Sequence, residues 1–206
     1  MIPFVVFKME VVLVAYTPNP EELCAKAMRC CRSAEAMHKL KLDKPAEYYI
    51  ALASQTGHLS VLEHASFTFS VKDVSRVTTH QLVRHRIASY SQQSFRSVQP
   101  KDICIPESIK QNETLKQEFK DHYMRSLWLQ QDLIEQGIPT EDFRYILPQG
   151  MLTNIVITMN ARELLHFFEL RLDKTAQWEI RGMAELMLHE VQKVAPNIFK
   201  IEEILK

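Results

Sequence analysis

Residues 154–171 read NIVITMNARELLHFFELR, and this stretch decides the fold class because a strand pattern changes into a helix pattern within it. Residues 154–159 are apolar and rich in β-branched side chains, which is typical of a buried strand. Asn160 then has the side chain of a helix N-cap, and Glu163 three residues later makes a capping box. A helix is therefore expected to follow a strand directly.

More strands and helices are predicted on either side of this stretch. Residues 10–16 are β-branched and apolar, and residues 64–71 (HASFTFSV) alternate apolar and polar side chains as a half-buried strand does. Helices are expected at 20–36, at 44–55, just before Arg84, at 108–136, between Thr140 and Pro148, and at 174–194. Asn19 is the expected cap of the first helix, and Gly57 is the expected stop of the second. Asp73 or Ser75 is expected to cap the helix before Arg84. A few strands and five or six helices indicate an α+β protein.

Composition restricts the classes of function. The 206 residues suit one domain, and Lys plus Arg equals Asp plus Glu at 25 each. A neutral chain has no global field that would draw it onto nucleic acid or an anionic membrane. The four glycines are far apart, which excludes a Gly-rich phosphate loop and a dinucleotide fingerprint. Side chains must therefore do much of the work of holding any nucleotide.

The cysteines and the N-terminal residues indicate a reducing compartment. Cys24, Cys30, Cys31 and Cys104 form no C-x-x-C pair, so plain thiols and no metal site are expected. The stretch MIPFVVFKMEVVLVAY (1–16) contains Lys8 and Glu10 and has no cleavage-site pattern, so it predicts a strand and not a signal peptide. No apolar run approaches membrane-spanning length. A cytoplasmic protein with no membrane partner is expected.

The strongest local signal is a carboxylate-free stretch. Residues 74–100 contain no aspartate or glutamate but hold four arginines and two histidines: Arg76, Arg84, Arg86, Arg96, His80 and His85. Arginine forks match phosphate oxygens in pairs, so this stretch suits a phosphorylated ligand. Composition alone leaves open a solvated basic surface. A patch that binds RNA is less favoured, because Tyr90 and Phe95 are the only aromatic residues there.

Residues 84–94 (RHRIASYSQQS) consist of RHR, seven residues and a serine, and this spacing resembles the signature of flavin-dependent thymidylate synthases. Four further blocks resemble that family in the same order: GHLSVLEHASFTFSVK (57–72), RYILPQG (144–150), NARELLHFFELR (160–171) and AQWEIR (176–181). The resemblance implies one domain over residues 1–206 with a small, mainly antiparallel sheet covered by helices.

The resemblance also implies an activity. Members convert dUMP into dTMP with 5,10-methylenetetrahydrofolate as carbon donor and a bound FAD as hydride carrier, which NADPH or another reductant reduces. They are typically homotetramers with sites between subunits. No nucleic-acid partner is implied. The chemistry agrees, because a cation beside the uracil ring would stabilise a ring anion, and an arginine does so without titrating.

Site residues follow from the same resemblance. FAD contacts are implied for Ser60, Arg84, His85, Arg86, Gln92, Asn160, Arg162 and His166, with His58 near the flavin. Contacts to dUMP are implied for Gln81, Leu82, Val83, Arg84, Gln92, Gln93, Ser94, Phe95, Arg96, Arg144 and Arg171. Arg171 is the catalytic candidate. Ser94 is interpreted as a phosphate ligand and not a nucleophile, because no nearby carboxylate orients a histidine base.

Two positions depart from the family pattern, and two rivals remain. Gln92 stands where a glutamate is frequent, so no carboxylate role carries over to it, and His166 stands where some members have asparagine. One rival is a flavoprotein of the same fold that acts on another pyrimidine nucleotide. The other is a nucleic-acid-binding module that uses the basic stretch.

Overall fold

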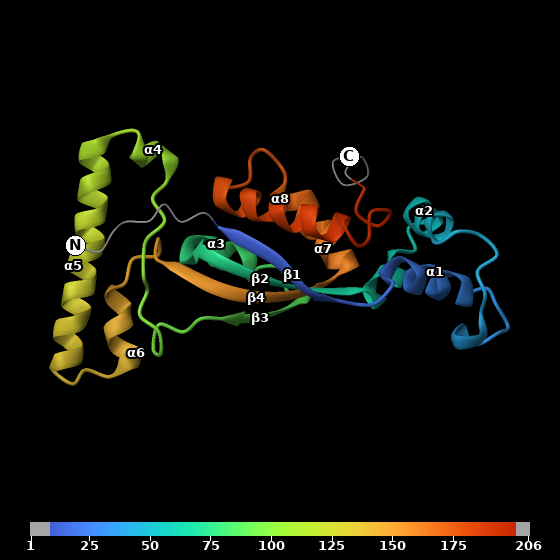
Figure 1. Ribbon diagram of the computed structural model, residues 1–206, viewed down its shortest axis with the longest axis horizontal. Coiled ribbons are helices and arrows are strands. Elements are labelled where there is room, and N and C mark those ends of the chain that lie inside the picture. The colour runs from blue at the N-terminus through green and yellow to red at the C-terminus, as the bar shows by residue number, and fades with distance from the viewer. Residues whose placement is uncertain (1–8, 201–206) are drawn as a thin grey trace. The chain divides into compact units, whose positions relative to one another are not determined.

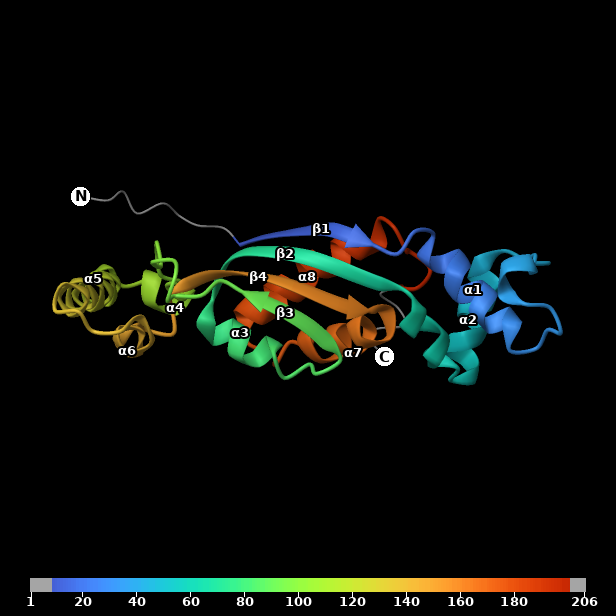
Figure 2. The same ribbon diagram turned by 90° about the horizontal axis from the view of Figure 1, so that it is seen from below.

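The computed structural model describes residues 9–200 and has the predicted α+β architecture. Four strands form one antiparallel sheet in the order β1-β2-β4-β3 (Figures 1 and 2). Their bounds are Glu10–Tyr16 (β1), Ser66–Ser75 (β2), Leu152–Asn160 (β4) and Ala88–Gln92 (β3). The three predicted strands are confirmed, whereas β3 was not predicted. Residues 1–8, where the N-terminal strand prediction begins, lie outside the described residues.

The chain divides into two compact units, which are described separately. Unit 1 consists of residues 9–10, Lys72–Leu82 and Ser91–Ile155. Unit 2 consists of Val11–Val71, Val83–Tyr90 and residues 156–200. The prediction of a single domain over residues 1–206 stays a prediction, because compactness does not measure how the two units unfold.

The core of unit 2 lies beneath helices α7 (Ala161–Arg171) and α8 (Trp178–Gln192), which cover one face of its strands (Figure 1). Phe67 and Phe69 of β2 are fully buried, while the alternating Thr68 is half-buried, as the period of two predicts. Phe67 and Phe168 each pack edge-on against Phe199, at 5.4 and 5.9 Å between ring centroids. Burial of each such ring contributes about 2–3 kcal/mol.

The cap predictions around this core are partly confirmed. The Asn160 side chain accepts a hydrogen bond from the Glu163 backbone N–H at 2.9 Å, so α7 begins where expected. The last helix begins at Trp178 and not at 174, because the Gln177 side chain accepts from the N–H groups of Glu179 and Ile180. It ends at Gln192, two residues before the predicted end.

The N-terminal helices of unit 2 are α1 (Pro20–Cys30) and α2 (Ala46–Thr56), with the 3-10 helices Met37–Lys39 and Leu59–His64 after them. The prediction of a helix to residue 36 was wrong. The Ser33 hydroxyl accepts a hydrogen bond from the Glu35 backbone N–H, and the chain forms a turn there in place of a helix. Asn19 precedes α1 as predicted, but it adopts a left-handed conformation and makes no side-chain cap. Gly57 ends α2 with φ 72°, as the sequence indicated.

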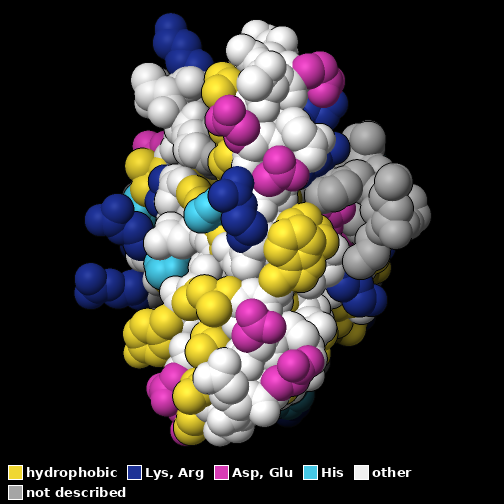
Figure 3. Space-filling view, turned by 90° about the vertical axis from the view of Figure 1, so that its left-hand side faces the viewer, with side chains coloured by type: hydrophobic (Ala, Val, Ile, Leu, Met, Phe, Trp, Pro, Cys, Tyr) yellow, Lys and Arg dark blue, Asp and Glu magenta, His cyan; other side chains and the backbone are white. Residues whose placement is uncertain are grey.

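Unit 1 contains α3 (Arg76–Leu82), α4 (Glu107–Lys110), α5 (Glu113–Glu135), α6 (Thr140–Phe143) and a 3-10 turn over Arg144–Ile146. Ser75, one of the two predicted caps, accepts from the Thr78 N–H. The predicted helix over 108–136 is two helices, because the Asn112 side chain caps a new one at the Leu115 N–H. The core is small and consists of Phe95, Ile103, Ile105, Tyr123 and Met151. Acidic, basic and hydrophobic side chains are interspersed on the side that carries α5 (Figure 3).

Two further findings concern the cysteines and the helices. All four cysteines are free, and burial raises the pKa of the Cys24 thiol to about 11. Among residues 9–200, no helix has the length and apolar character needed to cross a membrane.

We expect both units to unfold together, because β2, β3 and β4 each carry residues of both. The two tryptophans report on the units separately, with Trp128 in unit 1 and Trp178 in unit 2. In urea titrations of the apoprotein, Trp128→Phe and Trp178→Phe should give fluorescence midpoints that coincide with the circular dichroism midpoint. Separate midpoints would identify two independent domains.

Candidate active site

The residues expected to contact ligands divide between the two units. Unit 2 contains His58, Ser60, Val83, Arg84, His85, Arg86, Asn160, Arg162, His166 and Arg171. Unit 1 contains Gln81, Leu82, Gln92, Gln93, Ser94, Phe95, Arg96 and Arg144. The residues assigned to FAD therefore lie in unit 2, with the exception of Gln92, and most of those assigned to dUMP lie in unit 1.

Unit 2 has a cavity of about 710 Å³, here named the large cavity. Its lining includes three residues assigned to FAD: Asn160, Arg162 and His166. The other lining residues are Ser54, Leu59, Glu63, Ile87, Glu163, Leu165, Glu169 and Ile198. The size is usual for cofactor sites, and the lining combines four apolar residues with seven polar or charged ones, three of them glutamates.

The remaining residues assigned to FAD flank the large cavity in sequence. His58 and Ser60 are exposed on either side of Leu59, which lines it. Arg84 and Arg86 are exposed on either side of the buried His85, and Ile87 from the same segment lines the cavity. Arg162 forms an ion pair with Glu63 at 2.6 Å, so one carboxylate already neutralises that guanidinium.

His85 of this segment belongs to a cluster of three side chains, in which His85 and Glu163 are buried and Arg171 is half-buried. Arg171, the last residue of α7, donates through Nε to His85 Nε2 at 3.0 Å. The other ring nitrogen of His85, Nδ1, lies 3.4 Å from Glu163 Oε1. The side chains of His85 and Glu163 are 3% and 8% exposed, so water competes little for these contacts.

Burial sets the protonation states of this cluster. It lowers the pKa of His85 to about 4, and the positive charge of Arg171 and the nearby His166 add to the effect. The pKa of Glu163 is raised by burial, which His166 partly opposes. The pKa of Arg171 is lowered by burial and by Arg84. His85 is therefore neutral near pH 7, and its ring can accept a hydrogen bond.

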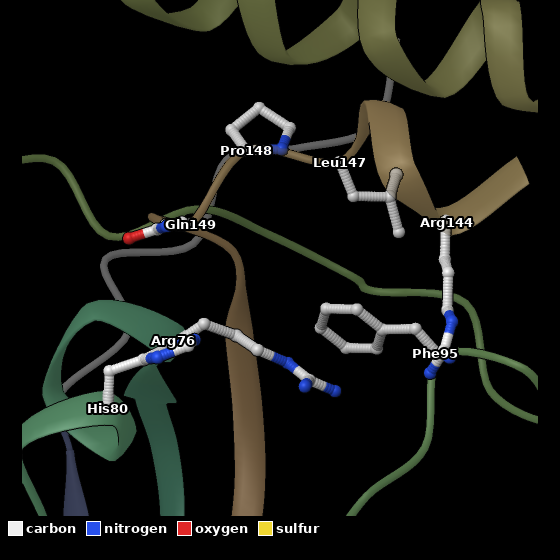
Figure 4. Close-up of a pocket in the computed structure, with 7 residues that line it drawn as sticks. All are labelled: Arg76, His80, Phe95, Arg144, Leu147, Pro148 and Gln149. Carbon is white, nitrogen blue, oxygen red and sulfur yellow. The ribbon is translucent and has the colours of Figure 1, made fainter. Parts of the chain in front are cut away.

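Unit 1 has a smaller cavity of about 170 Å³, here named the arginine pocket. Its lining residues are Arg76, His80, Phe95, Arg144, Leu147, Pro148 and Gln149, with no carboxylate among them (Figure 4). The side chains of Arg76 and Arg144 both extend toward Phe95 (Figure 4). The Arg76 guanidinium lies over the Phe95 ring at 4.1 Å and donates to the Gln93 carbonyl at 3.0 Å.

The electrostatics of the arginine pocket favour an anion. Burial and the neighbouring charge of Arg144 lower the pKa of Arg76. The Arg76 Nε atom is buried with no hydrogen-bond partner. A phosphate oxygen would satisfy such a donor and offset the repulsion between the two guanidinium groups.

The other residues assigned to dUMP have mixed surroundings. Ser94 begins a turn and accepts the Arg96 N–H at 3.2 Å, and Arg96 itself is exposed. Gln92 donates to the Thr79 hydroxyl at 3.1 Å and so links β3 to α3. The Leu82 side chain is fully buried, so only its backbone is placed to contact a ligand.

Sequence reasoning missed the roles of three residues. Arg76 was recognised only as one member of the basic stretch, and Glu163 only as part of a capping box. Tyr90 was counted as an aromatic residue, but its hydroxyl donates to the His85 carbonyl at 2.7 Å. No local sequence signal identifies these contacts, because each depends on a partner that the fold brings near.

In the part of the chain that the structure describes, no group of three or more His, Cys, Asp or Glu side chains could hold a metal ion.

Comparisons with known proteins agree on one family. The family model described as "Thymidylate synthase complementing protein" matches residues 12–197. Proteins named flavin-dependent thymidylate synthase are 47% identical in Saccharolobus solfataricus (91% of this chain, 74% of the relative) and 43% identical in Geobacter sulfurreducens (93% and 86%). The protein of that name in Pyrococcus horikoshii is 49% identical over 89% of this chain and 79% of its own.

One solved structure has the same fold. It is described as a UMP/dUMP methylase PolB from Streptomyces cacaoi bound with 5-Br dUMP, with a TM-score of 0.84 over 94% of each chain. The sequence identity is 24%, so this likeness shows the fold alone.

We expect His85 to make the apoprotein less stable in mild acid. Between its folded pKa of about 4 and its ordinary value of 6.5, the unfolded chain binds a proton that the folded chain excludes. The free energy of unfolding should therefore fall as the pH drops through this range, and fall less in His85→Gln. Thermal melts between these pH values measure the difference.

The control for this experiment is His189→Gln, because His189 is exposed. It should follow the wild-type pH dependence. Equal pH slopes for the wild type and His85→Gln would contradict the assignment of a neutral, buried imidazole.

Proposed function

Because this chain belongs to the family of flavin-dependent thymidylate synthases, we propose that it catalyses the reductive methylation of dUMP to dTMP. The observation that carries the proposal is the 43–49% identity to relatives of that name over about nine-tenths of the chain. FAD is the proposed cofactor, 5,10-methylenetetrahydrofolate the carbon donor, and NADPH or another reductant the source of electrons.

The donor set of the large cavity fits FAD. Asn160, Arg162 and His166 offer hydrogen-bond donors, and Leu59, Ile87 and Leu165 offer apolar surface for a planar ring. Glu63 and Glu169 suit hydroxyl groups better than a diphosphate, so we assign the diphosphate to the exposed Arg84 and Arg86. When bound, FAD supplies the redox chemistry, and the protein binds and orients.

The arginine pocket supports a site for the dUMP phosphate. Arg144 was expected to contact dUMP from the family pattern, and Arg76 joins it in a pocket lined by no carboxylate. We place Ser94 and Arg96 at the same phosphate, because both lie in the turn that carries Phe95. The neutral His85 holds Arg171, and we propose that the Arg171 cation stabilises negative charge on the uracil ring.

We also propose a homotetramer in the cytoplasm. Val12, Val14 and Tyr16 of β1 are 42%, 55% and 46% exposed and alternate along the strand, so they share one face. An apolar stripe of this kind is usually covered by another chain. The mass from sedimentation equilibrium tests the tetramer, and a monomer at micromolar concentration would contradict it.

A second candidate is a flavoprotein that acts on another pyrimidine nucleotide. It is kept because the Streptomyces cacaoi protein of the same fold is described as a methylase of both UMP and dUMP. Parallel assays with dUMP and UMP decide between them. The nucleic-acid-binding alternative has no structural observation in its favour.

The proposed function is tested by assay of the purified protein with FAD, NADPH, 5,10-methylenetetrahydrofolate and dUMP. We expect flavin absorbance that the reductant bleaches, and dTMP detected by mass spectrometry. Arg171→Ala should lower kcat by about 100-fold or more, because an interaction with developing charge is lost, while FAD stays bound.

The matched control is Arg32→Ala, since Arg32 is an exposed arginine of the same unit and lies outside both cavities. It should retain full activity. Failure of the purified protein to bind FAD, or to form dTMP, would contradict the proposed function. Loss of FAD binding in Arg171→Ala would show that its role is assigned wrongly.

Arg76→Ala should raise the KM for dUMP by about tenfold or more, because a hydrogen bond to a charged group is worth about 1.5–3 kcal/mol. FAD affinity should not change. Steady-state kinetics and flavin titration measure the two effects. Arg125→Ala, an exposed arginine of α5, is the control, and equal KM values in both variants would contradict a role for Arg76 at the phosphate.

A further inference from the structure

We propose that Glu163 is a positioning residue that acts through His85 to hold the guanidinium of Arg171 in its working orientation. This inference rests on the proposed function, because that function makes Arg171 the catalytic arginine. All three residues belong to unit 2, so the inference depends only on geometry within that unit.

The contact between Arg171 and His85 forms with one tautomer of the imidazole only, and the other ring nitrogen faces Glu163. A guanidinium has only donors, so the bond of 3.0 Å from Arg171 Nε requires an unprotonated Nε2 on His85. The single proton of the neutral ring must then lie on Nδ1. That atom is 3.4 Å from Glu163 Oε1, longer than the usual N–H···O hydrogen bond, so we infer that the carboxylate attracts the ring N–H mainly by its charge.

The reverse arrangement is excluded by the same contact. If Glu163 were protonated and donated to Nδ1, the ring proton would move to Nε2 and oppose the Arg171 N–H. A doubly protonated ring would oppose it as well. Burial and the charge of Arg171 lower the pKa of His85 to about 4, which keeps the ring neutral as both contacts require.

Helix α7 supplies both partners of the ring. Glu163 lies in its first turn, fixed by the bond from its backbone N–H to Asn160, and Arg171 is its last residue. His85 is therefore held from both ends of one helix, with the Phe167 ring packed against it at 5.0 Å. Since Arg171 is bound through Nε, the contact fixes the plane of the guanidinium and the direction of both terminal nitrogens.

Removal of the Glu163 carboxylate should shift the equilibrium of the His85 ring from the Nδ1–H form toward the Nε2–H form. In Glu163→Leu the Nδ1 proton has no acceptor, and a ring with its proton on Nε2 faces the Arg171 N–H as donor against donor. In Glu163→Gln the amide oxygen can still accept from Nδ1. The two variants therefore separate loss of the acceptor from loss of the charge.

The first measurement uses the apoprotein, so it requires no turnover. In protein labelled with ¹⁵N-histidine, NMR shifts of the ring nitrogens identify the His85 tautomer, and the signal missing in His85→Gln assigns it. We expect Nδ1–H in the wild type and Glu163→Gln, and a shift toward Nε2–H in Glu163→Leu. An unchanged tautomer in Glu163→Leu would overturn the proposal.

The second measurement is kinetic. Glu163→Leu should lower kcat about tenfold or more, measured at saturating FAD because Glu163 also lines the large cavity, while the KM for dUMP stays within about twofold, and Glu163→Gln should recover most of the rate. The matched control is Glu179→Gln, because Glu179 is another buried glutamate of unit 2 and starts a different helix. Equal losses in Glu163→Leu and Glu179→Gln would indicate general destabilisation and overturn the positioning role.

A double-mutant cycle keeps the proposal testable if the leucine variant alone folds poorly. In the His85→Gln background, adding Glu163→Ala, which removes the acceptor as the leucine does, should cost no further rate, because Glu163 acts through the ring that is already lost. Additive losses would overturn the proposal. Absence of dTMP formation by the wild type would instead refute the proposed function, and the tautomer measurement would still decide the contact itself.

Discussion

The hydrogen bond from Arg171 to His85 governs the chemistry of unit 2, because a guanidinium can only donate. It requires a neutral ring with one defined tautomer, and burial beside a cation provides the neutral ring. The same histidine is tied through its carbonyl to the Tyr90 hydroxyl. Side-chain contacts from α7 and β3 thus hold a segment whose neighbouring arginines, Arg84 and Arg86, remain exposed for a ligand.

Unit 1 concentrates positive charge in a chain whose net charge is zero. Arg76 and Arg144 line one pocket although they are far apart in sequence. The repulsion between their positive charges is unfavourable when no anion is bound. The Phe95 ring offsets part of this cost by packing against the Arg76 guanidinium. Part of the carboxylate-free sequence therefore lines a pocket whose charge favours an anion, whereas Arg84, Arg86 and Arg96 are exposed.

Local signals in the sequence predicted much of the fold. The alternation along β2, the Asn160 cap and the stop at Gly57 depend on near neighbours, and all three are confirmed. Strand β3 was missed because ASYSQ is polar and lies at the edge of the sheet, where no apolar period is needed. Family resemblance proposed Arg171 and Arg144 as site residues, but not Glu163 or Arg76. The contacts of those two residues exist only after distant segments have folded together.

Strand β4 passes into α7 with no loop between them, and Asn160 is both the last residue of the strand and the cap of the helix. An inserted or deleted residue at this junction would turn the helix by about 100° about its axis. That rotation would carry Glu163 away from His85 and Arg162 away from the large cavity. Insertions and deletions should therefore be tolerated in segments such as 31–45, which has only one short 3-10 turn. They should not be tolerated at the junction between β4 and α7.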